Sequence, residues 1–271
     1  MRMQGLNKWS APILLLVSVA SCTWSPESRY LEEAQKYSEK KEWSKSLDKY
    51  EMAVRTAPES AEALTAAAEA IKLSGTHKEY HRLTMFLKHV ILYSKSDLER
   101  AQAQKTLAMT YFNDLGDYTN AVIEINKAMQ WRRPDIEKAE LRLTLARAYF
   151  FQNRFFQARS EVDELLKETV DPDIKFKGIL LKANVFFNEK KLDEAIEFYH
   201  KLQKDFPEQA KAEQVPLNLA VCYEEKEDFE KAIEILEEMR DGYSAPEMID
   251  LKITRLKARQ AQQPGAKGLK K

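Results

Sequence analysis

Apolar positions recur at helical spacing from residue 27 to residue 260, and short polar turns interrupt them at regular intervals. Each unit has a small residue, a larger apolar residue three positions later, a polar turn and a second amphipathic stretch. A proline closes five of these stretches: Pro58, Pro134, Pro172, Pro207 and Pro246. Proline lacks an amide hydrogen and disfavours helix in the preceding residue, so each second helix should end there. The pattern predicts helical hairpins that repeat about every 36 residues.

Two copies of the unit define its spacing. The stretch LAVCYEEKEDFEKAIEILEEM places Ala220, Tyr223, Phe229, Ala232 and Leu236, and AQKYSEKKEWSKSLDKYEMAVRTAP places Ala34, Tyr37, Trp43, Ser46 and Tyr50 at matching intervals. This arrangement resembles the tetratricopeptide repeat (TPR), a helix-turn-helix unit of about 34 residues. The resemblance implies an all-α fold, a right-handed TPR α-solenoid of about six repeats plus a C-terminal capping helix. Small residues at positions eight and twenty let paired helices approach closely, and large ones fill the grooves.

The repeats are expected over residues 27–246. Their predicted bounds are 27–60, 61–100, 101–138, 139–175, 176–212 and 213–246. The third carries one extra turn residue in NDLGDY, and the second needs about three extra residues before Tyr80 can take the seventeenth place. A capping helix is predicted over 247–260, with Met248, Leu251 and Leu256 on one side. The basic stretch 261–271 is expected to be a disordered tail, with contact to anionic lipid or cell wall as the alternative to simple solvation.

The amino-terminal stretch differs from the rest of the chain. A positive head precedes APILLLVSVA, which is too short to cross a bilayer, and small residues lead to Cys22. The run Val19-Ala20-Ser21-Cys22 resembles the lipobox of bacterial lipoproteins, which implies a signal peptide over 1–21 and a lipidated amino terminus and linker over 22–26. Thr23 follows the cysteine, and the resemblance then implies an outer-membrane anchor that faces the periplasm. An ordinary secreted protein or an uncleaved anchor remains the alternative.

Composition and motifs argue against several classes of function. Basic and acidic residues number 43 each, which gives no electrostatic reason to expect nucleic-acid binding. Phosphate-binding and hydrolase motifs are missing, so we expect no enzyme, no cofactor and no small-molecule substrate. His77 and His81 stand four apart, but no third ligand is evident, so we predict no metal site. Cys222 lies on an apolar helical pattern and is expected to be a buried thiol.

The TPR resemblance implies that the first helix of each repeat lines a concave groove that binds protein partners. The residues carried over to that groove are Met109, Phe112, Asn113, Arg147, Phe150, Phe151, Asn184, Phe187, Asn188 and Asn218. Phe112, Phe150 and Phe187 hold the same place in three successive repeats, which predicts an aromatic column that suits extended or helical peptides. The alternative is that these rings pack between adjacent helices as ordinary core.

These expectations combine into a scaffold that binds protein partners in the bacterial envelope while lipid holds it to the membrane. Six repeats on a lipoprotein of this length resemble the pilotins of type IV pili, which suggests an assembly factor for a pilus or secretion complex. An adaptor that recruits peptidoglycan hydrolases or β-barrel assembly components is the alternative. A cell-wall-modifying enzyme would need paired acidic residues in a deep pocket, which the repeat positions do not supply.

Overall fold

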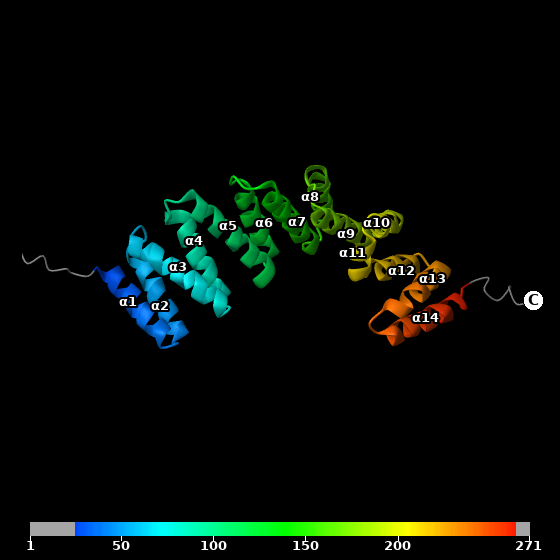
Figure 1. Cartoon of the computed structure of the whole chain (residues 1–271), viewed down its shortest axis with the longest axis horizontal. Helices are drawn as coiled ribbons and strands as arrows, with labels where there is room; N and C mark the ends of the chain where they lie inside the picture. Colours follow the sequence, from blue (N-terminus) through cyan, green and yellow to red (C-terminus); the bar gives the residue numbers. More distant parts are fainter. Residues whose placement is uncertain (1–24, 264–271) are drawn as a thin grey trace, which may run out of the picture. The chain divides into compact units, whose positions relative to one another are not determined.

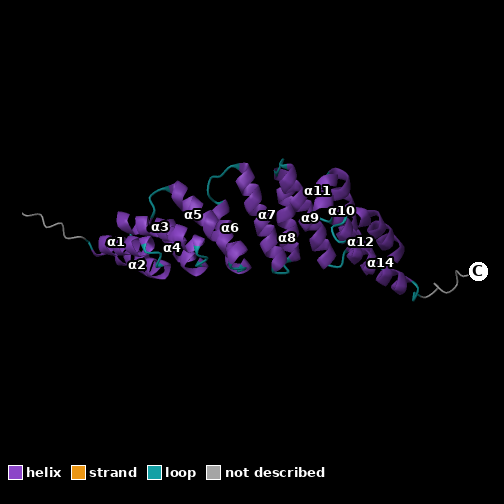
Figure 2. Cartoon of the chain, turned by 60° about the horizontal axis from the view of Figure 1, so that its bottom comes forward, coloured by secondary structure: helices purple, strands orange, loops and turns teal. Residues whose placement is uncertain are grey.

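A computed structural model describes residues 25–263, and the predicted signal peptide, Cys22 and the end of the basic stretch lie outside this range. Within it the chain forms α-helices, one π-helical and one 3-10 segment and no strand (Figures 1 and 2). The segments are α1 (Pro26–Glu39), α2 (Trp43–Thr56), α3 (Ala61–Thr76), α4 (Tyr80–Tyr93), α5 (Asp97–Met109), η1 (Thr110–Asp114), α6 (Tyr118–Met129), α7 (Asp135–Phe151), α8 (Phe155–Glu168), α9 (Pro172–Asn188), α10 (Leu192–Asp205), α11 (Pro207–Ala212), α12 (Val215–Glu225), α13 (Phe229–Met239), η2 (Arg240–Gly242) and α14 (Pro246–Gln260).

The helices fall into two compact units, Met1–Ala66 and Ala67–Lys271. In the first unit, α1 and α2 form a hairpin that closes around two small residues. The hydroxyl of Ser46 donates a hydrogen bond of 2.8 Å to the carbonyl oxygen of Ala34, and neither residue is exposed. These residues hold positions eight and twenty of the repeat, so the predicted close approach of the paired helices is confirmed.

In the second unit the same arrangement recurs in the hairpins α5–α6, α7–α8, α9–α10 and α12–α13. The predicted small residues are fully buried in all four: Ala108, Ala121, Ala146, Ala158, Ala183, Ala195, Ala220 and Ala232. A side chain larger than alanine at any of these places would push the paired helices apart, because protein interiors are close-packed. Small size at the crossing therefore holds each hairpin together.

Most of the turns within the hairpins share one backbone geometry. A residue with left-handed backbone precedes an amide that bonds to the carbonyl oxygen five residues earlier, as Arg154 bonds to Tyr149 at 2.9 Å. The turn after α3 follows the same rule, since the amide of Glu79 bonds to the oxygen of Ser74 at 2.9 Å. The expected three extra residues before Tyr80 are therefore wrong. The turn keeps its usual length, and α3 extends further than the alanine pattern indicated.

The extra residue of the third repeat lies in the helix and not in the turn. The turn at Gly116 has the usual left-handed backbone, but its closing bond, from Asp117 to Tyr111, spans six residues. The added residue is taken up by η1, where the amide of Leu115 bonds to the oxygen of Thr110. The segment η1 follows α5 directly, so the first helix of the third repeat ends in a π-helical turn.

Two features near the carboxyl end differ from the repeat pattern. The six-residue helix α11 separates α10 from α12, and no such helix was expected. In α14 the buried residues are Ile249, Ile253 and Leu256. Met248 and Leu251 are 63% and 54% exposed, so the prediction that they share the side of Leu256 is wrong. Ile249, Ile253 and Leu256 are separated by four and three residues, so they lie on the same face of α14, and this face packs against α13.

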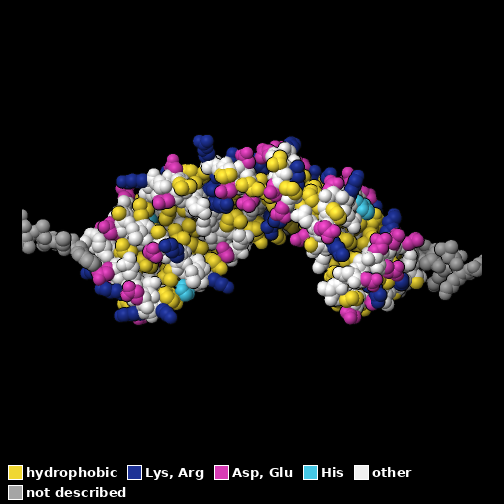
Figure 3. Space-filling view, in the orientation of Figure 1, with side chains coloured by type: hydrophobic (Ala, Val, Ile, Leu, Met, Phe, Trp, Pro, Cys, Tyr) yellow, Lys and Arg dark blue, Asp and Glu magenta, His cyan; other side chains and the backbone are white. Residues whose placement is uncertain are grey.

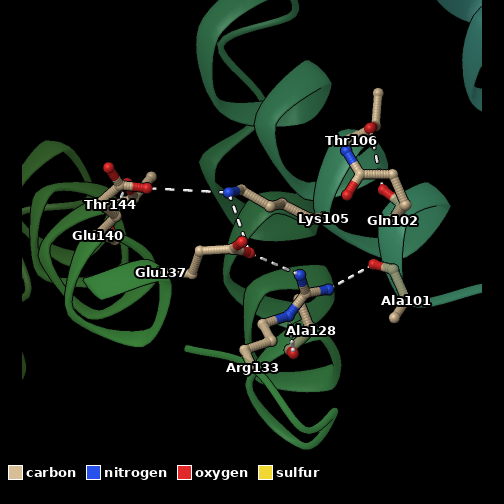
Figure 4. Close-up of polar contacts among 9 residues, drawn as sticks. All are labelled: Ala101, Gln102, Lys105, Thr106, Ala128, Arg133, Glu137, Glu140 and Thr144. Carbon is tan, nitrogen blue, oxygen red and sulfur yellow. Dashed lines mark hydrogen bonds and ion pairs between the residues drawn. The ribbon is translucent and has the colours of Figure 1, made fainter. Parts of the chain in front are cut away.

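A buried arginine in the loop between α6 and α7 ties three helices together (Figure 4). The side chain of Arg133 is 5% exposed and donates to the carbonyl oxygens of Ala128, at 3.0 Å, and Ala101. It also donates to the carboxylate of Glu137 at 3.1 Å, which accepts from Lys105 of α5 at 3.3 Å. The hydrogen bonds from Lys105 and Arg133 hold the pKa of Glu137 below its usual value. This network fixes α7 against α5 and α6.

Candidate peptide-binding site

Five aromatic rings from η1, α6, α7 and α8 form a continuous cluster, here called the aromatic patch: Phe112, Tyr118, Phe150, Phe151 and Phe155. Tyr118 stacks on Phe151, with ring centroids 4.8 Å apart and an interplanar angle of 18°. Phe112 meets Tyr118 edge-on at 5.6 Å and lies 6.1 Å from Phe151. Phe151 of the fourth repeat therefore contacts the two rings that flank the turn of the third repeat, within one unit (Figure 1).

The remaining contacts anchor the patch to the core. Phe150 lies 5.7 Å from Phe151 and 6.0 Å from Phe155, between ring centroids. Both Phe150 and Phe155 pack against the buried cluster of α7, α8 and α9 that contains Val162 and Leu165. The hydrophobic core beneath Phe150 and Phe155 therefore holds the patch in a fixed position.

Exposure differs sharply within the patch. Phe151 is 46% exposed, whereas Phe112 is only 6% exposed. Tyr118, Phe150 and Phe155 are half-buried. Phe151 is thus the ring that a partner would contact, and Phe112 forms the floor beneath it. The expectation that Phe112 is a groove-surface residue is wrong, because η1 turns its ring inward against Tyr118 and Phe151.

The position of Tyr118 depends on a helix cap. Asp117 precedes α6, and its carboxylate accepts a bond from the backbone amide of Asn120 at 3.0 Å and from the Asn120 side chain at 2.6 Å. These two bonds lower the pKa of Asp117. A capped first turn fixes the direction in which Tyr118 leaves the helix and so supports its stacking on Phe151.

Replacing Asp117 with alanine is expected to cost about 1 kcal/mol of stability at neutral pH, the usual value of an N-cap. Because the pKa is lowered in the folded state, the contribution of the charge is complete above the unfolded pKa of about 3.9 and is lost as pH falls through the folded value. Urea titrations of wild type and variant at several pH values should therefore converge in acid. Asp117→Asn is the control, since its amide keeps the cap without titrating. A difference that grows in acid would contradict this account.

Arg147 of α7 lies over the patch. Its guanidinium carbon is 5.2 Å from the centroid of Phe112, a cation–π arrangement, and the residue is exposed. Among the described residues it has no carboxylate within ion-pair distance, whereas Arg142 of the same helix pairs with Glu161 at 3.2 Å. The patch therefore presents one unpaired positive charge beside an exposed ring.

The other predicted groove residues do not join this patch. Phe187 is half-buried, and Lys190 lies 5.6 Å from its centroid, so the described contacts do not continue the column from Phe150 to Phe187. Asn184 accepts a bond of 2.6 Å from the hydroxyl of Tyr199, and its carbonyl oxygen accepts one of 2.8 Å from Asn188. The remaining three are Met109 and Asn218, both half-buried, and Asn113, which is exposed.

Groups with chemical reactivity do not gather in the described part of the chain. No cluster of three or more histidine, cysteine, aspartate or glutamate residues suited to a metal ion occurs in residues 25–263. His77 follows the end of α3 while His81 lies in α4, so the two do not share one helix. Cys222 is fully buried, and burial raises the pKa of its thiol to about 11. The described helices include none long and apolar enough to span a membrane.

The basic residues of α14 are largely neutralised within the fold. Lys252 and Arg259 both pair with Glu224, at 2.9 and 2.5 Å, and Lys257 pairs with Glu237 at 3.0 Å. Acidic and basic side chains are likewise interspersed over the visible face (Figure 3). The described part of the basic end therefore offers less free positive charge to anionic lipid than its sequence suggests.

Sequence reasoning missed two members of the patch. Tyr118 and Phe155 hold the seventeenth position of their repeats, and that position was expected to fill grooves between helices. The available signal was that both begin a second helix directly after an aromatic first-helix end, which brings Tyr118 close to Phe112 and Phe155 close to Phe150. Position within a single repeat does not show the further contact of Tyr118 with Phe151 of the next repeat.

Comparisons with known proteins agree with the repeat geometry. Residues 178–208 and 217–238 match family models of the tetratricopeptide repeat. The chain has no match among curated proteins.

Three solved structures share the fold at low sequence identity. The Naa15/Naa10 complex bound to HypK superimposes with a TM-score of 0.62 at 16% identity, over 81% of this chain and 33% of that one. YrrB, described as a TPR protein with an unusual peptide-binding site, gives 0.53 at 18% identity, over 76% of this chain and 97% of that one. PilW gives 0.52 at 11% identity, over 82% and 97%. The chain thus carries tetratricopeptide repeats, and its helices form a TPR α-solenoid.

Proposed function

We propose that this protein is a non-catalytic TPR scaffold that docks a protein partner on the aromatic patch. One observation carries the proposal: Phe151 is 46% exposed although it is locked in contact with Tyr118, Phe112 and Phe150. An exposed aromatic ring on a rigid support loses little conformational entropy on binding. Aromatic residues and arginine dominate binding hot spots for this reason.

The local irregularity of the chain supports the same proposal. The π-helical segment η1 departs from the repeat at the place where Phe112 forms the floor of the patch. A third repeat without the added residue would pack its helices equally well. The added residue therefore changes the local position of side chains such as Phe112, and not the packing of the repeats. π-helical turns of this kind are concentrated at functional sites.

The proposed location is the bacterial envelope. Lipid on Cys22 would anchor the protein to the outer membrane, and its helical part would face the periplasm. This part rests on the lipobox-like run at 19–22. PilW is described as a widely conserved type IV pilus biogenesis factor. Since the two chains share a fold, a pilotin-like role in pilus assembly is the version to test first, and recruitment of peptidoglycan hydrolases or β-barrel assembly components is the alternative.

Photocrosslinking in intact cells tests the docking surface. A photoreactive phenylalanine analogue replaces Phe151 in the full-length protein, and cross-linked proteins are identified by mass spectrometry. Phe156 is the matched control, because it is 72% exposed in α8 and makes no ring contact with the patch in the described structure. We expect a discrete partner from position 151 alone. The same products from both positions, or none from position 151, would overturn the proposal. The partner's identity decides among the pilus, cell-wall and barrel-assembly roles.

Replacing Cys22 with serine is expected to abolish incorporation of radiolabelled palmitate and to release the protein from membranes. The reason is that only the thiol can form the thioether to diacylglycerol, and two or more acyl chains are needed for a stable anchor. Flotation on a density gradient checks the second effect. Cys222→Ser is the control and should keep both label and membrane association. Labelling that persists in the Cys22→Ser protein would show that this cysteine is not the lipid site.

A further inference from the structure

The charged side chains around the patch that lack an ion-pair partner indicate what kind of peptide segment the patch binds. Three basic residues on neighbouring first helices already have carboxylate partners: Lys105 with Glu137 at 3.3 Å, Lys177 with Asp173 at 2.6 Å and Lys182 with Asp163 at 2.5 Å. Arg147 is exposed and has no such partner among the described residues. The carboxylate of Asp114, at the end of η1, accepts a hydrogen bond from the hydroxyl of Tyr80.

The hydrogen-bond donors of Arg147 are available to a ligand. The guanidinium carbon lies 5.2 Å from the centroid of Phe112, and the side chain makes no hydrogen bond or ion pair among the described residues. The N–H donors of arginine lie in the plane of the group, where they match the two oxygens of a carboxylate. The ring beneath also keeps the side chain from folding away, so less entropy is lost when a carboxylate binds.

We propose that the docked segment carries an aspartate or glutamate side chain next to an aromatic or large aliphatic residue. The carboxylate bonds to Arg147, and the apolar residue covers Phe151. This inference rests on the proposed function and specifies the partner of the same site. The charge complementarity of one free cation beside one exposed ring selects a segment that pairs one acidic group with one apolar group.

Other anions fit this site less well. A phosphorylated residue carries close to two charges and binds clusters of arginine. In the described structure one arginine, Arg147, lies over a ring of the patch. A terminal carboxylate would need several polar donors around it. Asn184 is committed to Tyr199, and neither it nor Asn218 contacts the patch in the described structure. An internal acidic side chain needs only the single bidentate contact that Arg147 can make.

Peptide display tests the inference on the full-length protein purified in detergent. Random 12-residue peptides are displayed with a fused carboxyl end, which removes free terminal carboxylates, and are selected on wild type, Arg147→Gln and Phe151→Ala. The selected peptides are then synthesised with amidated ends in acid and amide versions, and their affinities are measured by fluorescence anisotropy. Arg255→Gln is the matched control, since Arg255 is exposed in α14 and has no ion pair in the described structure.

We expect wild type to enrich peptides with an acidic residue beside an aromatic or aliphatic one. Arg147→Gln and the amide peptides should each bind about tenfold more weakly or worse, as for loss of a charged hydrogen bond, without adding to each other. Unchanged binding by Arg147→Gln together with lost binding by Phe151→Ala would overturn the acidic-partner inference and leave the docking patch intact. Failure of wild type to select peptides, or selection unaffected by both changes, would overturn both proposals.

Discussion

Replacing Phe112 with alanine is expected to lower the free energy of unfolding by about 3–5 kcal/mol, whereas Phe151→Ala should cost less than about 1 kcal/mol. The two rings touch, yet Phe112 is 6% exposed and Phe151 is 46% exposed. Removal of Phe112 leaves a cavity under Tyr118 and Phe151, while removal of Phe151 leaves no enclosed cavity, because that ring is already open to water. Direct contact with the partner should show the reverse order: Phe151→Ala should remove more of the contact than Phe112→Ala.

Urea denaturation followed by circular dichroism measures the stability difference, and binding of the selected peptides measures the second property. Phe156→Ala is the control for loss of an exposed ring outside the patch. Equal destabilisation by Phe112→Ala and Phe151→Ala would mean that both rings belong to the core. That result would contradict the proposal that the patch is a binding surface. A folded, stable Phe112→Ala protein would contradict the described burial.

Replacing Arg133 with methionine is expected to cost about 2–4 kcal/mol, because two carbonyl oxygens and one carboxylate lose a buried, charged donor. Methionine keeps most of the aliphatic volume, so the change isolates the polar contacts. Arg132→Met is the matched control: Arg132 is the adjacent residue, is exposed and has no ion pair in the described structure. We expect it to change stability by less than about 0.5 kcal/mol.

The loss at Arg133 falls on the junction between helices of successive repeats. Stability in repeat arrays is close to a sum of intrinsic and nearest-neighbour terms, so a weakened junction allows the two sides to unfold separately. Trp131 reports on this place, since Arg100 lies 5.1 Å from its ring centroid. We expect Trp131 fluorescence to change at lower urea than circular dichroism in the variant. Coincident transitions with unchanged midpoint would show that the network is dispensable.

The hairpins could be predicted because their determinants are local and repeated. Ala34 and Ser46 lie twelve residues apart in sequence, and their sizes alone specify that two helices meet there. Each later repeat has the same pair of small residues, so a wrong alignment of one repeat can be recognised by comparison with the others. The prolines likewise indicated helix ends without reference to any distant residue.

What sequence reasoning could not predict was the response of a helix to one added residue. By position in the repeat Phe112 and Phe150 are equivalent, yet one is buried and the other half-buried. The spacing from Tyr111 to Tyr118 reveals that a residue has been added. It does not reveal whether the turn or the helix absorbs it. The contact of Tyr118 with Phe151 was missed because it joins two successive repeats, and position within one repeat does not show it.

The concealment of Cys222 has a practical use. A thiol with no solvent contact and a pKa of about 11 is present almost wholly in its unreactive protonated form at neutral pH. A maleimide reagent applied to the native full-length chain should therefore pass over this sulfur. Under the proposed lipidation, any modification gained before denaturation counts the copies of Cys22 that carry no lipid, which turns an ordinary thiol assay into a measure of processing.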